Sequence, residues 1–85
     1  MPELSRFLGI IIFMNFNDHA PPHFHAKYGD YQITIEIRTG IIEGKFPPRA
    51  LKLVLEWYEI HKDELMKDWE SIMETGDFSK IAPLE

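Results

Sequence analysis

The chain has 85 residues, of which 45% are hydrophobic, 13% aromatic and 27% charged; its formal net charge is −5 and it has no cysteine. We expect one globular domain spanning residues 1–85, and we exclude a disulfide-stabilised scaffold and a thiolate zinc site. The charge is uneven: residues 1–50 carry five basic and five acidic side chains, whereas residues 51–85 carry four and nine. Nucleic-acid-binding domains usually have the opposite balance, so the acidic half favours contact with a basic protein.

The first predicted strand is the apolar run of residues 7–16, which Gly9 and Asn15 interrupt. Its apolar residues fall at both odd and even positions, as in a central strand covered on both faces. At about ten residues the run is too short to cross a bilayer, and no small-residue cleavage site of a signal peptide follows it. We therefore expect a soluble cytoplasmic protein with no membrane segment.

Three further strands are predicted, at residues 23–28, 31–38 and 41–46. The first two alternate between apolar and polar residues and flank Gly29-Asp30, a favourable two-residue hairpin turn. Thr39-Gly40 predicts a second turn, and the strand after it contains a glycine typical of an edge position.

A helical segment is predicted for residues 48–75, because Pro47-Pro48 suits a helix start, Thr75-Gly76 suits a helix end, and apolar residues recur between them at helical spacing. A straight helix of this length would run about 40 Å, more than a globule of this size offers. We expect either two helices with a break near His61–Asp63 or one long helix with an overhanging end.

The predicted fold class is therefore α+β, an antiparallel β-meander of about four strands followed by one or two helices packed on one face. The helical stripe should cover the sheet face that carries three alternating isoleucines, Ile33, Ile35 and Ile37. The tail after Gly76 should pack back on the core.

Chemistry is concentrated in one segment, Asn17-Asp18-His19-Ala20-Pro21-Pro22-His23-Phe24-His25, which holds three of the four histidines. If both turns have two residues, His23 pairs with Glu36, and Glu36 pairs with Glu43 on the next strand. These side chains and His25 would then share one polar sheet face beneath the loop.

Three interpretations of this cluster stay open. In the first, His19, His23 and His25, together with Asp18 or Glu36, bind zinc or another divalent metal, because imidazole and carboxylate groups are common ligands of such ions. In the second, His23 and His25 are catalytic acid/base groups oriented by Glu36 or Glu43, without a metal. In the third, the cluster is structural and the histidines form hydrogen bonds or lie in an interface.

The helical segment also carries aromatic residues beside its main apolar stripe. Core packing is the usual role of such residues, but a second aromatic face is also typical of an interaction surface. We therefore expect a partner-binding surface formed by Trp57, Tyr58, Glu59 and Trp69.

Several segments together resemble the bacterial family called domain of unknown function 4160 (DUF4160). They are Phe7-Leu8-Gly9-Ile10, the segment from Phe16 to Ala26, the Gly29 and Thr39-Gly40 turns, Pro47-Pro48-Arg49-Ala50-Leu51, and Trp57 before the stretch from Glu59 to Leu65. The resemblance implies a small bacterial cytoplasmic protein, often encoded beside a second short protein, in pairs that are associated with toxin–antitoxin modules.

Two functional hypotheses follow. The first is a component of a two-protein bacterial module, of the toxin–antitoxin type, that acts through a second small protein encoded nearby; a homo-oligomer is also compatible. The second is a small metal-dependent or histidine-based hydrolase that uses the cluster. An RNA substrate would depend on a few cations, namely Arg6, Lys27, Arg38 and Lys45, because the overall charge does not favour RNA.

Overall fold

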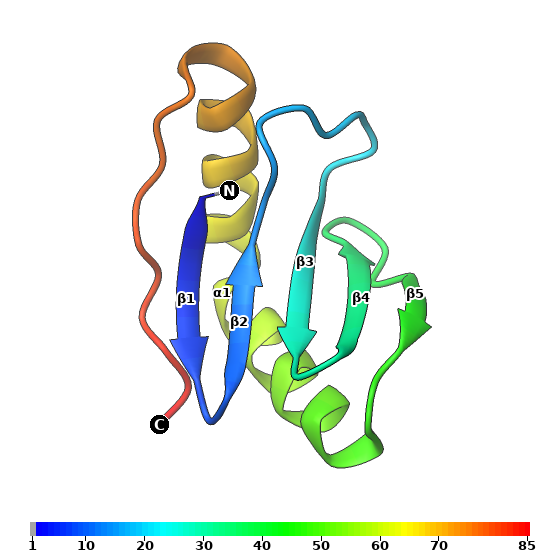
Figure 1. Cartoon of the computed structure of the whole chain (residues 1–85). Helices are drawn as coiled ribbons and strands as arrows, with labels where there is room; N and C mark the ends of the chain where they lie inside the picture. The colour runs from blue at the N-terminus through cyan, green and yellow to red at the C-terminus, as the bar shows by residue number, and fades with distance from the viewer. Residues whose placement is uncertain (1) are drawn as a thin grey trace.

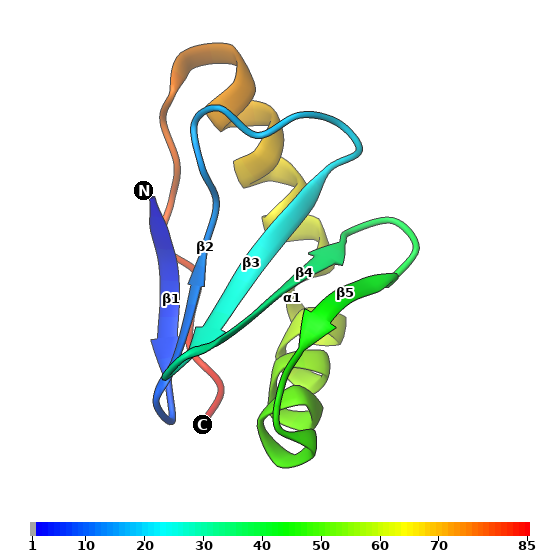
Figure 2. The ribbon, with the colours of Figure 1, turned by 45° about the vertical axis from the view of Figure 1, so that its right-hand side comes forward.

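The computed structural model describes residues 2–85, which form a five-stranded antiparallel sheet and one long helix (Figure 1). The helix crosses one face of the sheet, here called the helix face, and no helix lies on the other face, here called the outer face (Figures 1 and 2). This architecture confirms the predicted α+β fold class. The strands lie side by side in chain order, and the elements are β1 (Glu3–Phe7), β2 (Ile10–Phe13), β3 (His23–Tyr28), β4 (Tyr31–Glu36), β5 (Ile42–Lys45) and α1 (Pro48–Thr75).

The single strand predicted for residues 7–16 is wrong, because the chain reverses inside it. Leu8 and Gly9 both have positive φ angles, 49° and 82°, and form a tight turn that pairs β1 with β2. Such turns need left-handed backbone at both central positions, which leucine rarely adopts. Because Glu3–Phe7 form an additional strand, the sheet has five strands instead of about four.

The β3–β4 hairpin has the predicted register, with His23 opposite Glu36 and His25 opposite Thr34. The next register is wrong by two residues, since Glu43 lies opposite Thr34 and not opposite Glu36. The connection is longer than a two-residue turn: β4 ends at Glu36, whose N–H donates to the Ile41 carbonyl (2.9 Å). Because a shift of two residues preserves the face of each side chain, Glu43 still lies on the outer face.

The helical segment is one helix with a kink, at the position where the break was expected. His61 has non-helical angles (φ −114°, ψ 21°), while the helix continues on both sides of it. Pro48 occupies the first turn, and Gly76 ends the helix with a φ of 81°. A straight helix of this length would measure about 42 Å, and the kink helps to fit it into a molecule whose longest dimension is 34 Å.

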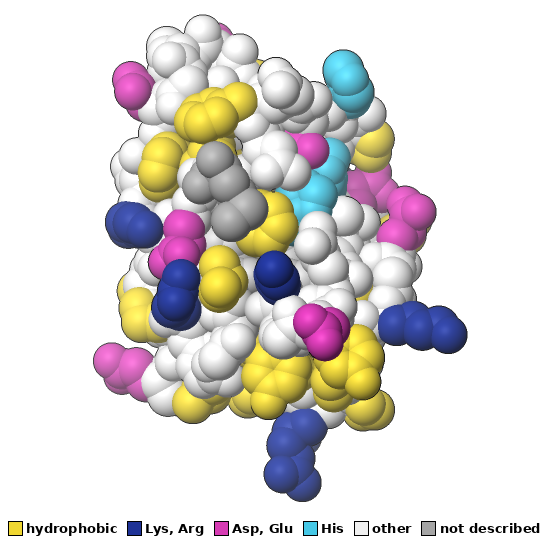
Figure 3. Space-filling view, in the orientation of Figure 1, with side chains coloured by type: hydrophobic (Ala, Val, Ile, Leu, Met, Phe, Trp, Pro, Cys, Tyr) yellow, Lys and Arg dark blue, Asp and Glu magenta, His cyan; other side chains and the backbone are white. Residues whose placement is uncertain are grey.

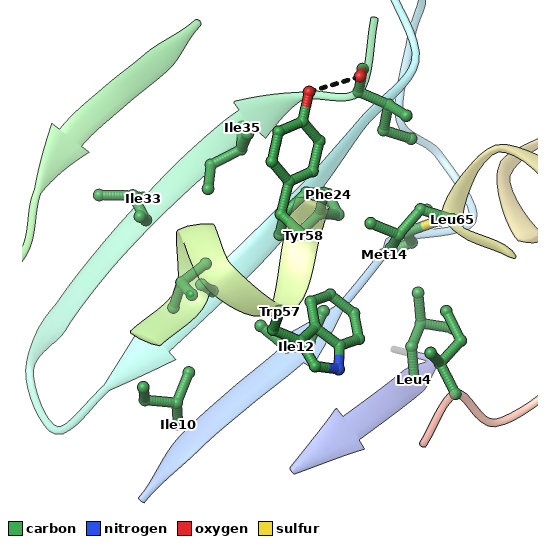
Figure 4. Close-up of a cluster of buried hydrophobic side chains, with 14 of the residues drawn as sticks. Leu4, Ile10, Ile12, Met14, Phe24, Ile33, Ile35, Trp57, Tyr58 and Leu65 are labelled. Atoms are coloured by element: carbon green, nitrogen blue, oxygen red, sulfur yellow. Dashed lines mark hydrogen bonds between the residues drawn. The ribbon is translucent and has the colours of Figure 1, made fainter. Parts of the chain in front are cut away.

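The core lies between α1 and the helix face of the sheet, as predicted from the three isoleucines (Figure 4). Tyr58 anchors the contact, because its hydroxyl donates to the Ile37 carbonyl (2.7 Å). The tail also packs back on the core: the indole N–H of Trp57 donates to the Ala82 carbonyl (2.8 Å), and Ile81 is buried. Within the tail Phe78 is exposed.

Among residues 2–85, α1 is long enough to span a bilayer, but no stretch of it is sufficiently apolar to do so.

Candidate functional site

The histidine cluster lies at one end of the outer face, where the loop between β2 and β3 meets the first residues of β3. Histidine side chains reach the surface in the upper right of this face (Figure 3). The alternation of β3 explains the arrangement: Phe24 points into the core, so His23 and His25 on either side of it point outward.

Asp18 is the centre of the hydrogen bonding in this cluster. Its Oδ2 accepts hydrogen bonds from the Asn15 backbone N–H (3.0 Å) and from His25 Nε2 (3.0 Å). Its Oδ1 lies 3.6 Å from His23 Nε2. Asn and Asp are common turn formers, and the Asn-x-x-Asp pattern of this loop is a signal that could have indicated the role of Asn15.

Asp18 is ionised at neutral pH in this environment. Partial burial raises the pKa of the Asp18 carboxyl, but the hydrogen bonds from the Asn15 amide and from His25 outweigh it, and the pKa is lowered from 3.8. The site therefore contributes one carboxylate charge beside two imidazole rings.

The two rings are held differently. His25 is 8% exposed, and its ring stacks on Phe13 with centroids 4.9 Å apart and planes inclined by 9°. His23 is held through Nδ1, which lies 2.9 Å from the Pro21 carbonyl oxygen. The His23 ring also lies 5.2 Å from the Trp69 ring of α1. Both rings thus have fixed positions, and both direct Nε2 toward the Asp18 carboxylate.

The structure brings together three of the four predicted metal ligands. One donor atom from each of Asp18, His23 and His25 lies within 4.8 Å of the other two, and no other such group occurs in residues 2–85. His19 is exposed and is not part of the group. It lines instead a small pocket of about 170 Å³ beside the cluster.

This pocket contains the predicted orienting carboxylate. Glu36 lines it together with His23, its cross-strand neighbour, and Oε2 of Glu36 accepts a hydrogen bond from the Thr39 hydroxyl (2.6 Å). The full lining is His19, Pro21, His23, Thr34, Glu36, Ile41 and Glu43. Glu36 therefore faces the same space as His23, although it does not belong to the Asp18-centred group.

Comparison with known sequences places the chain in a family. The sequence model described as domain of unknown function (DUF4160) matches residues 9–70. The chain belongs to this family. No curated protein and no solved structure matches it. The DUF4160 match includes the loop, β3, β4 and the pocket, so the whole candidate site lies within the part of the chain that is shared with the family.

The expected partner surface on this DUF4160 chain is not exposed. Trp57, Tyr58 and Trp69 are buried, at 0%, 3% and 6% exposure, because these aromatic side chains fill the contact between α1 and the sheet. Of the four residues, Glu59 alone is exposed. It lies at the rim of an apolar groove of about 440 Å³ along the first turns of α1, a feature that the sequence interpretation missed. The groove could have been predicted from Leu51 and Leu55, which lie one helical turn apart at the margin of the apolar stripe.

Proposed function

We propose that this protein is a small metal-dependent hydrolase of the cytoplasm, with a divalent metal ion bound by Asp18, His23 and His25. The observation that carries the proposal is that two imidazole nitrogens and one carboxylate oxygen lie within 4.8 Å of one another, and that one of the two histidines, His23, also lines a pocket. The argument for a metal, in preference to metal-free acid/base catalysis, comes from the groups that the two ring nitrogens of His23 face.

Both ring nitrogens of His23 already face other groups. Its Nδ1 faces the Pro21 carbonyl, which only accepts hydrogen bonds, so Nδ1 carries the proton. In the neutral ring Nε2 then has a lone pair, and it points toward an oxygen of the ionised Asp18. Two acceptors facing each other repel, and either a proton on Nε2 or a cation bound between them would relieve the repulsion. Nε2 of His23 and Nε2 of His25 are both directed at the Asp18 carboxylate, so the geometry favours one metal ion shared by the three groups. On binding it, His25 would release the Nε2 proton that it donates to Asp18.

The hydrogen-bond partner of the other ring nitrogen of His23 also suits a metal-binding histidine. Metal-bound histidines commonly donate their other N–H to a backbone carbonyl, which fixes the tautomer, and Pro21 supplies that carbonyl here. Two nitrogen ligands and one carboxylate suit zinc, iron, manganese or nickel. Three protein ligands leave coordination positions open for water or substrate, as in catalytic zinc sites.

Hydrolysis is the reaction class that we assign to this site. A bound ion of this kind lowers the pKa of a coordinated water, which supplies a nucleophile at neutral pH. Glu36 lines the adjacent pocket and is the carboxylate that would accept the proton of this water. An RNA substrate would require cations, and the strand registers place Arg6, Lys27 and Lys45 in one row across the outer face. We propose RNA as the substrate on the basis of this row of cations alone. The pocket itself gives no support, because its carboxylates Glu36 and Glu43 would repel the phosphate groups of RNA.

The first test is the metal content of the purified, untagged protein, measured by elemental mass spectrometry. We expect near-stoichiometric metal, its loss in the His23→Ala/His25→Ala variant, and its retention in His19→Ala, a matched control from the same loop outside the ligand group. Asp18→Asn keeps the shape of the side chain and should also lose the metal while circular dichroism shows a folded protein. A folded wild-type protein that neither retains metal nor binds added zinc would contradict the proposal.

A second candidate function is a component of a two-protein module of the toxin–antitoxin type, which acts through a small protein encoded nearby. It is supported by the uneven charge of the chain and by the exposed apolar groove on α1. The two functions are compatible. Size-exclusion chromatography of the protein mixed with the product of the neighbouring gene tests this candidate, and separate elution of the two proteins at micromolar concentration would count against it.

A further inference from the structure

We propose that the groove on α1 binds an amphipathic helix of a partner protein, whose apolar ridge is flanked by lysine or arginine. This inference rests on the second candidate function and is independent of the metal site. The groove lies on the first three turns of α1 and is lined by Pro48, Leu51, Lys52, Leu55, Glu56 and Glu59. These positions recur every three or four residues, so they form one continuous stripe along the helix.

The stripe is separate from the side of α1 that packs on the sheet. In the same turns Ala50, Val54 and Trp57 are buried in the core, whereas Leu51 and Leu55 are only partly buried. The apolar side chains of the groove are therefore left without a covering element among the described residues. A groove of this kind suits another helix, whose side chains at positions i, i+3 or i+4, and i+7 would fill it.

The charges at the rim indicate the chemistry of the partner. Glu56 and Glu59 are exposed, and Lys52 is the only cation in the lining. Lys62 lies 3.3 Å from Glu59, but both side chains are exposed. Exposed ion pairs are weak, so Glu59 can exchange Lys62 for a cation of a partner. The lining therefore carries two carboxylates against one ammonium group. A cationic helix complements these two carboxylates, whereas a second copy of the chain bound through the same groove would bring the same two carboxylates against each other.

Two synthetic helical peptides of roughly 20 residues provide the probe. Both carry the same leucine ridge, and one has lysines and the other glutamates beside it. We expect the lysine peptide to bind at least tenfold more tightly by isothermal titration calorimetry at low salt, with the difference shrinking as salt screens the charges. Amide chemical-shift changes in a ¹⁵N-labelled protein should be confined to the first three turns of α1.

Three variants distinguish binding in the groove from non-specific hydrophobic binding of the peptide. Leu55→Lys should weaken lysine-peptide binding at least tenfold, while Ile60→Lys, on the same helix at a side chain that is 66% exposed outside the lining, should leave it unchanged. Glu56→Lys/Glu59→Lys should reverse the preference toward the glutamate peptide. None of these residues belongs to the metal site, so metal content reports separately on the proposed hydrolase.

Three outcomes would overturn the inference. The first is equal binding of both peptides, or no binding at high micromolar concentration. The second is equal loss of binding in Leu55→Lys and Ile60→Lys. The third is a concentration-dependent dimer in analytical ultracentrifugation that Leu55→Lys abolishes, because the occupant would then be a second copy of the chain.

Discussion

The two faces of β3 follow the same alternation, yet they are buried in different ways. On the helix face, Phe24 and Ala26 are fully buried among apolar side chains of α1 and the sheet. On the outer face, His25 is almost as buried, but it lies between an aromatic ring and a carboxylate, with Nδ1 lacking a hydrogen-bond partner among the described residues. Burial on the first face stabilises the fold. Burial on the outer face costs free energy, because it removes polar groups such as His25 Nδ1 from water, and such a cost is typical of a functional site.

The largest effect that we predict is on the helix face. Trp57→Ala should lower the free energy of unfolding by about 3–5 kcal/mol, since it removes a fully buried indole and its hydrogen bond to Ala82. Domains of this size have only about 5–15 kcal/mol in total. Urea denaturation measures the loss, and Ile60→Ala, at an exposed position of the same helix, is the control. A loss below about 1 kcal/mol would show that the core does not depend on this contact.

The second prediction concerns β5, which carries Glu43 to the outer pocket. Gly44 has a φ of 106°, and a Cβ atom there would lie 2.6 Å from the Gln32 carbonyl oxygen. Gly44→Ala should therefore cost about 2 kcal/mol, from backbone strain and from the collision. Gly29→Ala is the matched control, because Gly29 also has a positive φ but no atom within 4 Å of the added Cβ. If urea denaturation shows the same loss of unfolding free energy in both variants, backbone strain explains the effect and the collision with the Gln32 carbonyl does not contribute.

The third prediction compares the outer face directly with the core. His25→Phe keeps the stacking on Phe13 and removes the unpartnered Nδ1, but it removes the hydrogen bond to Asp18. We expect a loss of only about 1 kcal/mol in metal-free protein, together with complete loss of the stabilisation that added zinc provides in thermal unfolding. A loss as large as that of Trp57→Ala would identify the cluster as structural.

The smallest predicted effect concerns Asp68, a buried polar residue on α1. Its Oδ1 accepts the Ser79 N–H (2.9 Å), while Oδ2 is buried and has no partner among the described residues. Burial raises the pKa of Asp68 above 3.8, the Ser79 N–H partly opposes this, and the nearby Glu64 charge adds to it. Because the folded-state pKa is raised, the stability that protonated Asp68 contributes is complete below pH 3.8 and is lost as the pH rises through the folded-state value.

Asp68→Asn should therefore raise the free energy of unfolding at pH 7 by up to about 1 kcal/mol, and by less at pH 3.5. Chemical denaturation at the two pH values measures this difference. Asp63→Asn, at an exposed position on the same helix, should show no comparable gain. A loss of stability at pH 7 would mean that the ionised carboxylate is favourably solvated.

Much of the architecture follows from sequence patterns alone. The alternation of residues 23–28 and 31–36 around Gly29-Asp30 determined the hairpin, its register and the face on which His23, His25 and Glu36 lie. Strand period and turn length are local properties, so they can be read from neighbouring residues. The same holds for the ends of α1 at Pro48 and Gly76, and for membership of DUF4160.

Other features depended on the tertiary structure. The turn at Leu8 carries no strong local signal, because its left-handed backbone is enforced by the pairing of β1 with β2. The burial of Trp57 and Trp69 depends on how α1 crosses the sheet, which helical spacing does not specify. The selection of Asp18 over His19 as the neighbour of His23 and His25 depends on the path of a loop whose shape is determined by contacts with β2 and β3. Local periodicity places residues on faces, but distances between segments far apart in the chain are determined only when the whole core has packed.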